Sequence, residues 1–195
     1  MLLLSRAACS QTFYPITVPE TPIYGTGFKV SSPASPGWML AIDRSSEAFA
    51  LARPDPDQAD RRGSIIVIAA RIKAKKANIE TPEALQAEVE QTIRASSSRH
   101  TLVSLTLEQE RDAEQGTDCI RISSTSEERN NPGRGGEVLL MSISGKACRH
   151  PSSTAYYVQV TYSERRPIKD PPLMDDNLRR ECQGIIDSLK FMPIQ

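Results

Sequence analysis

Cysteine thiols are the most reactive side chains in this sequence, which contains four of them. Cys119 is predicted to begin one strand and Cys148 to follow the end of the next, so a disulfide between them could form if the strands pair in register. A link between Cys148 and Cys182 is the alternative, and Cys182 could instead be a buried thiol. A catalytic thiol is not expected, because only His100 and His150 could assist it and no known signature surrounds any cysteine.

His150 has the most distinctive setting of the histidines, since it follows a predicted strand and precedes a proline. We expect it to cap backbone groups in a loop, because two distant histidines do not supply enough ligands for a transition metal. The acids Asp55, Asp57 and Asp60 share one loop, but they lack the spacing and the closing glutamate of a calcium loop. We therefore predict no metal and no cofactor.

Two polar stretches resemble functional motifs only in part. Residues 130–136 are rich in glycine, but they lack the Gly-Lys-Ser/Thr ending of a phosphate loop and no helix follows, so a hairpin tip is predicted. Residues 163–166 carry both charge signs, which predicts a local ion-pair cluster rather than a substrate clamp. No serine lies in a nucleophile elbow. We therefore predict no catalytic residue and no enzymatic activity.

The residues discussed above lie in or next to apolar runs that are predicted to form strands. The predicted strands cover residues 28–31, 38–42, 48–52, 65–70, 103–108, 119–123, 138–143 and 156–162. Residues 65–70 and 138–143 are apolar on both alternations, which is typical of strands in the middle of a sheet and covered on both faces. Residues 103–108 alternate with polar residues and predict one wetter face.

Two amphipathic helices complete the predicted architecture. Thr81 can cap a helix in which Pro82 takes the first position, and an apolar residue then recurs every four positions until residues 96–98. The second helix opens at residues 175–177 and ends near Leu189, and residues 190–193 could add a short edge strand. This order predicts an α+β fold, an antiparallel β-sheet flanked by helices.

Composition limits the partners that the chain can bind. With 195 residues, 38% of them hydrophobic, the chain is long enough for one self-sufficient domain, which we place at residues 26–195. Its 24 basic and 24 acidic side chains cancel, so no long-range field attracts a polyanion. Nucleic acid is therefore not an expected partner.

The N-terminus resembles the end of a bacterial lipoprotein signal peptide. Ala7, Ala8 and Cys9 match that family's pattern, in which the cysteine becomes the lipidated first residue of the mature protein. Arg6 and the short apolar stretch depart from the pattern and would fit a true start upstream; an ordinary unprocessed start is the alternative. The resemblance implies a lipid such as palmitate on Cys9.

Residues 10–25 contain three prolines, at positions 15, 19 and 22, that are expected to break any helix or strand. A semi-extended tether suits an anchored domain. Residues 1–25 are therefore predicted to be a lipobox-like start followed by a tether. No other stretch is long and apolar enough to span a bilayer.

The order of elements also resembles PsbP, the extrinsic photosystem II protein, and its structural relative, the Ran-binding protein Mog. The resemblance is carried by Phe28-Lys29-Val30-Ser31-Ser32-Pro33 with Trp38 after it, Thr81-Pro82-Glu83, Tyr162-Ser163-Glu164-Arg165, and Ile185-Ile186-Asp187-Ser188-Leu189-Lys190-Phe191. It covers residues 26–193 and implies a PsbP-like α/β/α sandwich. The group includes DcrB-like periplasmic lipoproteins and chaperones or immunity proteins of secretion systems, which bind other proteins without catalysis.

These observations favour a non-enzymatic lipoprotein of the bacterial envelope, anchored in the periplasm through Cys9, that binds another protein or assists an assembly. If Cys9 is unmodified, the alternative is a cytoplasmic secretion-system chaperone or immunity protein on the same fold. A third hypothesis is an enzyme or small-ligand carrier with a cleft between sheet and helix. The true N-terminus from the native cell would separate the first two.

Overall fold

The computed structural model describes residues 12–42, 47–53, 64–75, 78–95, 100–129 and 136–194. Cys9, the acids Asp55, Asp57 and Asp60, and most of the predicted hairpin tip at 130–136 lie outside the described residues. Among the described helices, none is both long and apolar enough to cross a membrane.

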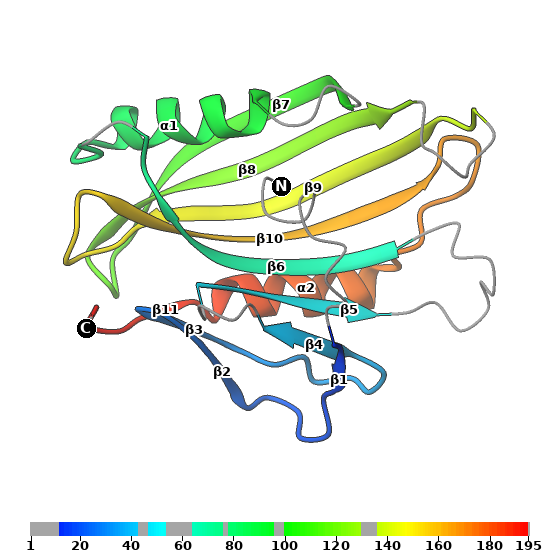
Figure 1. Cartoon of the computed structure of the whole chain (residues 1–195), viewed down its shortest axis with the longest axis horizontal. Coiled ribbons are helices and arrows are strands. Elements are labelled where there is room, and N and C mark those ends of the chain that lie inside the picture. The colour runs from blue at the N-terminus through cyan, green and yellow to red at the C-terminus, as the bar shows by residue number, and fades with distance from the viewer. Residues whose placement is uncertain are drawn as a thin grey trace.

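A curved antiparallel sheet of eight strands forms the centre of the fold, in the order β1-β4-β5-β6-β10-β9-β8-β7. The strands are β1 (Tyr14–Pro15), β4 (Met39–Ile42), β5 (Ala48–Arg53), β6 (Ser64–Lys73), β7 (His100–Asp112), β8 (Thr117–Glu128), β9 (Leu139–Arg149) and β10 (Tyr156–Pro167). The two apolar runs predicted to be central lie in β6 and β9, and each of these strands pairs with another strand on both sides. Figure 1 shows the sheet from β7 at the top to β1 at the bottom.

A second, three-stranded sheet has the order β11-β3-β2. It contains β2 (Pro22–Gly25), β3 (Phe28–Ser31) and β11 (Lys190–Phe191), which is the short edge strand expected after the last helix. Phe28 and Val30 of β3 belong to the main hydrophobic core. The two ends of the domain therefore meet in this small sheet.

The helices α1 (Pro82–Arg94) and α2 (Asp176–Asp187) cover opposite faces of the large sheet. Ile120, Ala147 and Tyr157 pack in the cluster beneath α1, whereas their strand neighbours Cys119 and Cys148 pack in the cluster beneath α2. Side chains alternate between the faces of a strand, so the two clusters lie on different sides. The structure therefore has the predicted α+β class with helices flanking the sheet.

Both helices begin as the sequence predicts. The Thr81 hydroxyl accepts the backbone N–H of Ala84 at 3.2 Å, and the Asp175 carboxylate accepts that of Leu178 at 2.8 Å. Each cap satisfies one of the N–H groups that a first turn leaves without a partner. The buried residues of α2 are Cys182, Ile185 and Ile186, and all three belong to the main core cluster.

The structure differs from the predicted boundary between tether and domain at residue 26. Tyr14 pairs with Leu40 in the large sheet, and Ile23 of β2 pairs with Val30 and is only 7% exposed. Pro15 and Pro22 lie in short strands at sheet edges, where no ladder hydrogen bond is required of their nitrogen, and Pro19 lies in the turn between these strands. Residues 12–25 are therefore part of the folded domain.

The strands of the second half are longer than the apolar runs that predict them. β8 and β9 continue through polar residues, since Cys119 lies within β8 and Cys148 within β9 rather than at or beyond strand ends. The extra residues pair with neighbouring strands along their full length. Backbone pairing extends these strands past the limits of their hydrophobic pattern.

Candidate functional site

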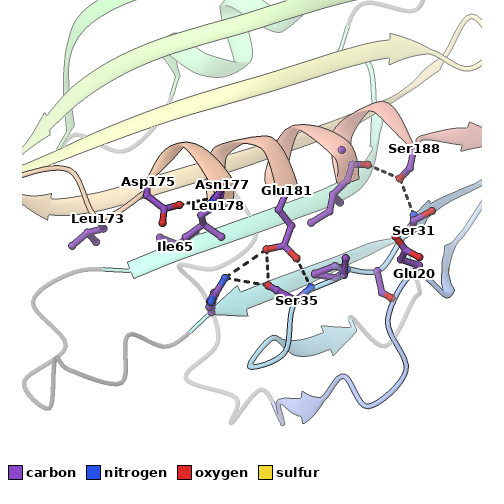
Figure 2. A pocket seen from close by; sticks show the side chains of 16 residues that line it. Glu20, Ser31, Ser35, Ile65, Leu173, Asp175, Asn177, Leu178, Glu181 and Ser188 are labelled. Atoms are coloured by element: carbon purple, nitrogen blue, oxygen red, sulfur yellow. Dashed lines mark hydrogen bonds and ion pairs between the residues drawn. The ribbon is translucent and has the colours of Figure 1, made fainter.

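A groove of about 930 Å³ lies between α2 and the segment that follows β3. One face of α2 forms its first wall, and residues 31–35 form the opposite wall (Figure 2). Ile65 of β6 and Leu173, which precedes α2, contribute apolar surface to it. The groove therefore offers apolar surface bordered by hydroxyl and carboxylate groups.

The groove face of α2 follows from helical spacing. Asn177, Leu178, Glu181, Gly184, Ile185 and Ser188 line the groove and recur at intervals of three and four residues. Cys182 and Ile186 point instead into the core and fix the rotation of the helix. The apolar stripe that the sequence reveals thus determines which polar residues of α2 face the groove.

Glu181 joins the two walls of the groove. Its carboxylate accepts the backbone N–H and the hydroxyl of Ser35, both at 2.7 Å. The indole N–H of the buried Trp38 donates to it at 3.4 Å, and Arg53 forms an ion pair with it at 3.5 Å. Figure 2 shows the contacts of Glu181 with Ser35. Since the Glu181 side chain is only 14% exposed and has these partners, its role here is to hold the wall in place.

A second tie lies at the other end of α2. The backbone N–H of Ser31 donates to the Ser188 hydroxyl at 2.8 Å, and that hydroxyl donates to the carbonyl of Ile185 at 2.7 Å. The segment after β3 is therefore fixed to α2 at both Ser31 and Ser35. The groove is held open by the fold rather than formed by a ligand.

Cys182 lies behind the groove and is the free cysteine of the described residues. Burial, together with the nearby Glu181 charge, raises the pKa of the Cys182 thiol to about 12, although Arg53 opposes the shift. A thiol with this pKa is almost entirely protonated near neutral pH. Cys182 is therefore a packing residue and does not supply a nucleophile to the groove.

We predict that Cys182 is resistant to alkylation in the folded protein. At pH 8 only about one thiol in ten thousand would be ionised, and the sulfur is shielded by the core. Iodoacetamide followed by peptide mass spectrometry should detect modification of Cys182 only in denaturant. Rapid labelling in native buffer would show that this core opens readily.

The structure joins Cys119 to Cys148, the first of the two pairings suggested by the sequence, with sulfur atoms 2.11 Å apart. The two residues are opposite each other in the register of β8 and β9, and both are fully buried. Cys182 belongs to the same core cluster but is not bonded to either. The disulfide thus staples two neighbouring strands beneath α2.

His150 contacts backbone groups, as predicted for a histidine that caps a loop. Its Nδ1 lies 3.2 Å from the N–H of Ser152, and its Nε2 lies 3.2 Å from the carbonyl of Gly27 and 3.0 Å from that of Met192. An Nε2–H tautomer satisfies all three contacts. His150 therefore links the β2–β3 turn to the C-terminal segment, away from the groove.

Residues 163–166 form ion pairs, as the sequence predicts. Glu164 lies 3.4 Å from Arg166, and Arg165 lies 2.5 Å from Glu128 at the end of β8. The arginines are held by carboxylates of the same sheet. This arrangement braces strand ends, and Glu164 also accepts the backbone N–H of Leu173 at the border of the groove.

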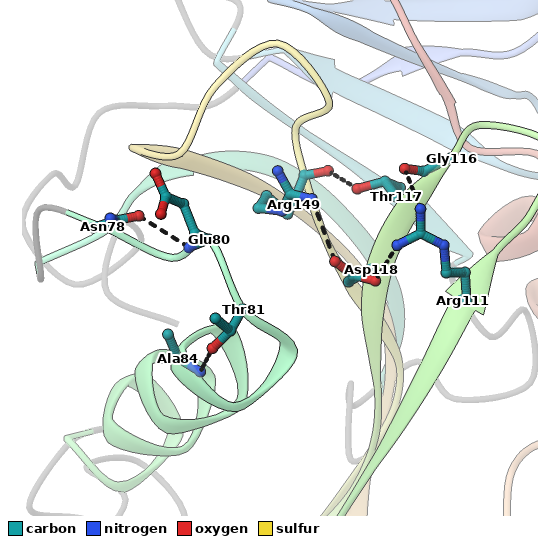
Figure 3. A network of polar contacts seen from close by, with 9 residues as sticks. All are labelled: Asn78, Glu80, Thr81, Ala84, Arg111, Gly116, Thr117, Asp118 and Arg149. Carbon is teal, nitrogen blue, oxygen red and sulfur yellow. Dashed lines mark hydrogen bonds and ion pairs between the residues drawn. The ribbon is translucent and has the colours of Figure 1, made fainter.

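A further polar network lies at the other end of β8. Asp118 accepts from Arg111 at 2.6 Å and pairs with Arg149 at 3.3 Å (Figure 3). Thr117 donates to the carbonyl of Arg149 at 2.5 Å. These contacts connect three neighbouring strands, so we read the network as structural. Among the described residues, no group of three or more His, Cys, Asp or Glu side chains is arranged to hold a metal.

Sequence reasoning did not identify the groove. Ser35 and Glu181 are 146 positions apart, and no local motif marks either of them. The helical stripe of α2 was visible in the sequence, but the segment that faces its polar side was not. Of the residues singled out in the sequence, neither the disulfide pair nor His150 lines the groove.

Comparisons with known proteins give structural similarity at low identity. No protein-family profile and no curated protein matches the chain. LpqN, a protein involved in cell envelope biogenesis of Mycobacterium tuberculosis, is 13% identical with a TM-score of 0.47, over 93% of this chain and 91% of its own. A mutant form of the protein Mog1 is 14% identical with a TM-score of 0.46, over 89% of this chain and 96% of its own.

A protein of Bacteroides thetaiotaomicron VPI-5482 is 12% identical with a TM-score of 0.41 over 90% of this chain. The match covers 50% of that protein, so this chain spans half of its length. All three are similar to this chain in structure only. The relationship to the PsbP-like group stays a prediction.

Proposed function

We propose that this chain is a non-enzymatic binding protein of the bacterial cell envelope, on a PsbP-like fold, that holds a segment of another protein in the α2 groove. The observation that carries the proposal is Gly184. It lies in the interior of α2 and on the groove face, and a β-carbon placed there would meet no atom of another segment within 4 Å.

A glycine inside a helix lowers stability, and the fold does not require a glycine at position 184. It destabilises a helix by about 0.5–1 kcal/mol relative to alanine. Neither close packing nor a positive φ demands glycine at 184. The missing side chain leaves the helix backbone open to the groove, which supports close approach of a bound segment at this point.

The chemistry of the walls supports a polypeptide ligand. Leu173 and Leu178 offer apolar surface, while the exposed Asn177 and the exposed acids Glu20 and Asp175 border it. Apolar surface with a few fixed polar groups is typical of binding sites. We propose that the bound segment carries apolar side chains and no acidic ones, because Glu20 and Asp175 would repel them.

The buried disulfide supports the proposed compartment. Stable disulfides form mainly in secreted, periplasmic and other oxidising environments. A covalent link between Cys119 and Cys148 therefore fits a protein that works outside the cytoplasm. The proposed anchor, a lipid on Cys9, would hold the domain at a membrane there.

A pair of substitutions at Gly184 tests the groove. Gly184→Leu is expected to fill the groove and to abolish partner binding, whereas Gly184→Ala, which adds a single carbon at the point of close approach, should weaken binding without abolishing it. Both should raise stability by about 0.5–1 kcal/mol, because each is a better helix former than glycine. Thermal unfolding therefore shows directly that any loss of binding does not come from misfolding.

Binding is measured in the native cell with a photo-cross-linking amino acid in place of Asn177. The expected result is an adduct with one defined partner that disappears in Gly184→Leu but persists in Gly184→Ala. The same probe at Arg179, an exposed α2 residue that does not line the groove, is the control. Equal adducts at both positions, or an adduct unchanged by Gly184→Leu, would contradict the proposal.

A further inference from the structure

An exposed apolar patch lies at the beginning of the described chain. Phe13, Tyr14 and Val18 are 37%, 61% and 56% exposed, and Ile42 is 49% exposed. We call these four residues the N-terminal patch. Large apolar side chains that gather on a surface often mark an interaction site, whereas single ones need no explanation.

Strand pairing brings two parts of the patch together. Tyr14 of β1 is opposite Leu40 of β4, and Ile42 is two residues farther along the same strand, so Tyr14 and Ile42 share a face of the sheet. β1 is the last strand at this edge of the sheet (Figure 1). Leu40 packs against the core cluster beneath α2, so Tyr14 and Ile42 lie on the α2 side of the sheet, at its exposed edge.

The covalent chain limits how far the patch can be from Cys9. Phe13 follows Cys9 by four residues, and a fully extended chain spans at most about 3.3–3.6 Å per residue. Phe13 must therefore lie within about 14 Å of Cys9, whatever path the chain takes. If Cys9 carries a lipid, this limit keeps Phe13, the first residue of the patch, near the membrane surface.

We propose that the N-terminal patch rests in the interfacial layer of the membrane that holds the lipid on Cys9. The proposal depends on the lipid anchor proposed above and adds a second, side-chain contact with the bilayer. Aromatic side chains with a polar end, such as Tyr14, prefer the region between headgroups and acyl chains. Phe13, Val18 and Ile42 add the apolar area that such binding requires.

The patch has a measurable consequence because one acyl chain binds membranes only weakly, and stable attachment needs a second signal. We would couple the unmodified full chain, with Cys119 and Cys148 oxidised, at Cys9 to a maleimide that carries a single 14-carbon chain. The buried Cys182 should not react. Partitioning is measured by flotation with vesicles of phosphatidylethanolamine and phosphatidylglycerol.

The expected result is that Phe13→Ser/Tyr14→Ser lowers vesicle partitioning at least tenfold. Val103→Ser is the control, since Val103 is 59% exposed and lies on β7, at the opposite edge of the sheet. It should partition like the unsubstituted chain. Circular dichroism confirms that each variant is folded.

Two outcomes would count against the proposal, and they can be told apart. Equal partitioning of the Phe13→Ser/Tyr14→Ser and Val103→Ser variants would overturn the membrane role of the patch, even if Cys9 is lipidated. Mass spectrometry of the protein from its native cell that shows an unmodified Cys9 would overturn the anchor itself. The coupled protein separates these cases because its acyl chain does not depend on cellular lipidation.

Discussion

Gly145→Ala is expected to destabilise the protein by about 3 kcal/mol or more, because the added carbon would collide with a neighbouring strand. A β-carbon at Gly145 would lie 2.2 Å from the carbonyl oxygen of Val160 and 2.6 Å from the α-carbon of Thr161. Gly145 and Thr161 are opposite each other in β9 and β10, inside the large sheet. Backbone atoms on both sides are held by strand pairing and cannot move aside cheaply.

The measurement is urea unfolding followed by circular dichroism. Gly184→Ala is the matched control, since the same substitution at a position with open space should stabilise the protein. Replacement of glycine by alanine is thus predicted to lower the free energy of unfolding at position 145 and to raise it at position 184. A loss of less than about 1 kcal/mol at position 145 would mean that the β9–β10 pair relaxes far more easily than its register suggests.

Removing the disulfide is expected to have an effect of similar size. Cys119 and Cys148 are separated by 29 positions, and opening a loop of that length costs about 3–4 kcal/mol in the chain-entropy account. Cys119→Ala/Cys148→Ala should therefore unfold at a clearly lower urea concentration than the oxidised protein. The slope of the transition should rise, because the unfolded chain without the cross-link is more expanded and exposes more surface to urea.

The control for this experiment is the unsubstituted protein reduced in denaturant and refolded with reductant. It keeps both sulfur atoms and lacks only the bond, so it separates the cross-link from the packing of the side chains. If the reduced and oxidised proteins have equal free energies of unfolding, the disulfide does not stabilise the fold. Its presence in protein from the native cell is checked by peptide mapping without reductant.

The groove and the N-terminal patch share one segment of the chain. Glu20 lines the groove, while Phe13, Tyr14 and Val18 belong to the patch. Residues 12–25, expected from their prolines to be a tether, therefore connect the proposed membrane contact to the proposed binding site. A partner held in the groove would be kept near the membrane surface.

Local patterns in the amino-acid sequence were enough to predict the fold class, the two helices and the central position of β6 and β9. These features depend on local periodicity and on helix caps such as Thr81 and Asp175, whose signals lie within a few residues. The sequence also narrowed the disulfide to Cys119 with Cys148, or Cys148 with Cys182. It could not choose between them because the choice depends on strand register.

The groove, the inclusion of residues 12–25 in the domain and the positions of the strand ends depend on contacts between distant segments, so they could not be predicted before the fold was known. Ser35 reaches Glu181 across 146 positions, and Tyr14 finds Leu40 through sheet pairing. Nothing in the local sequence distinguishes Gly145 from Gly184. Yet a β-carbon at Gly145 would collide with β10, whereas a β-carbon at Gly184 would meet open space. Contacts between distant segments carry no local pattern, so their consequences appear only when the chain is folded.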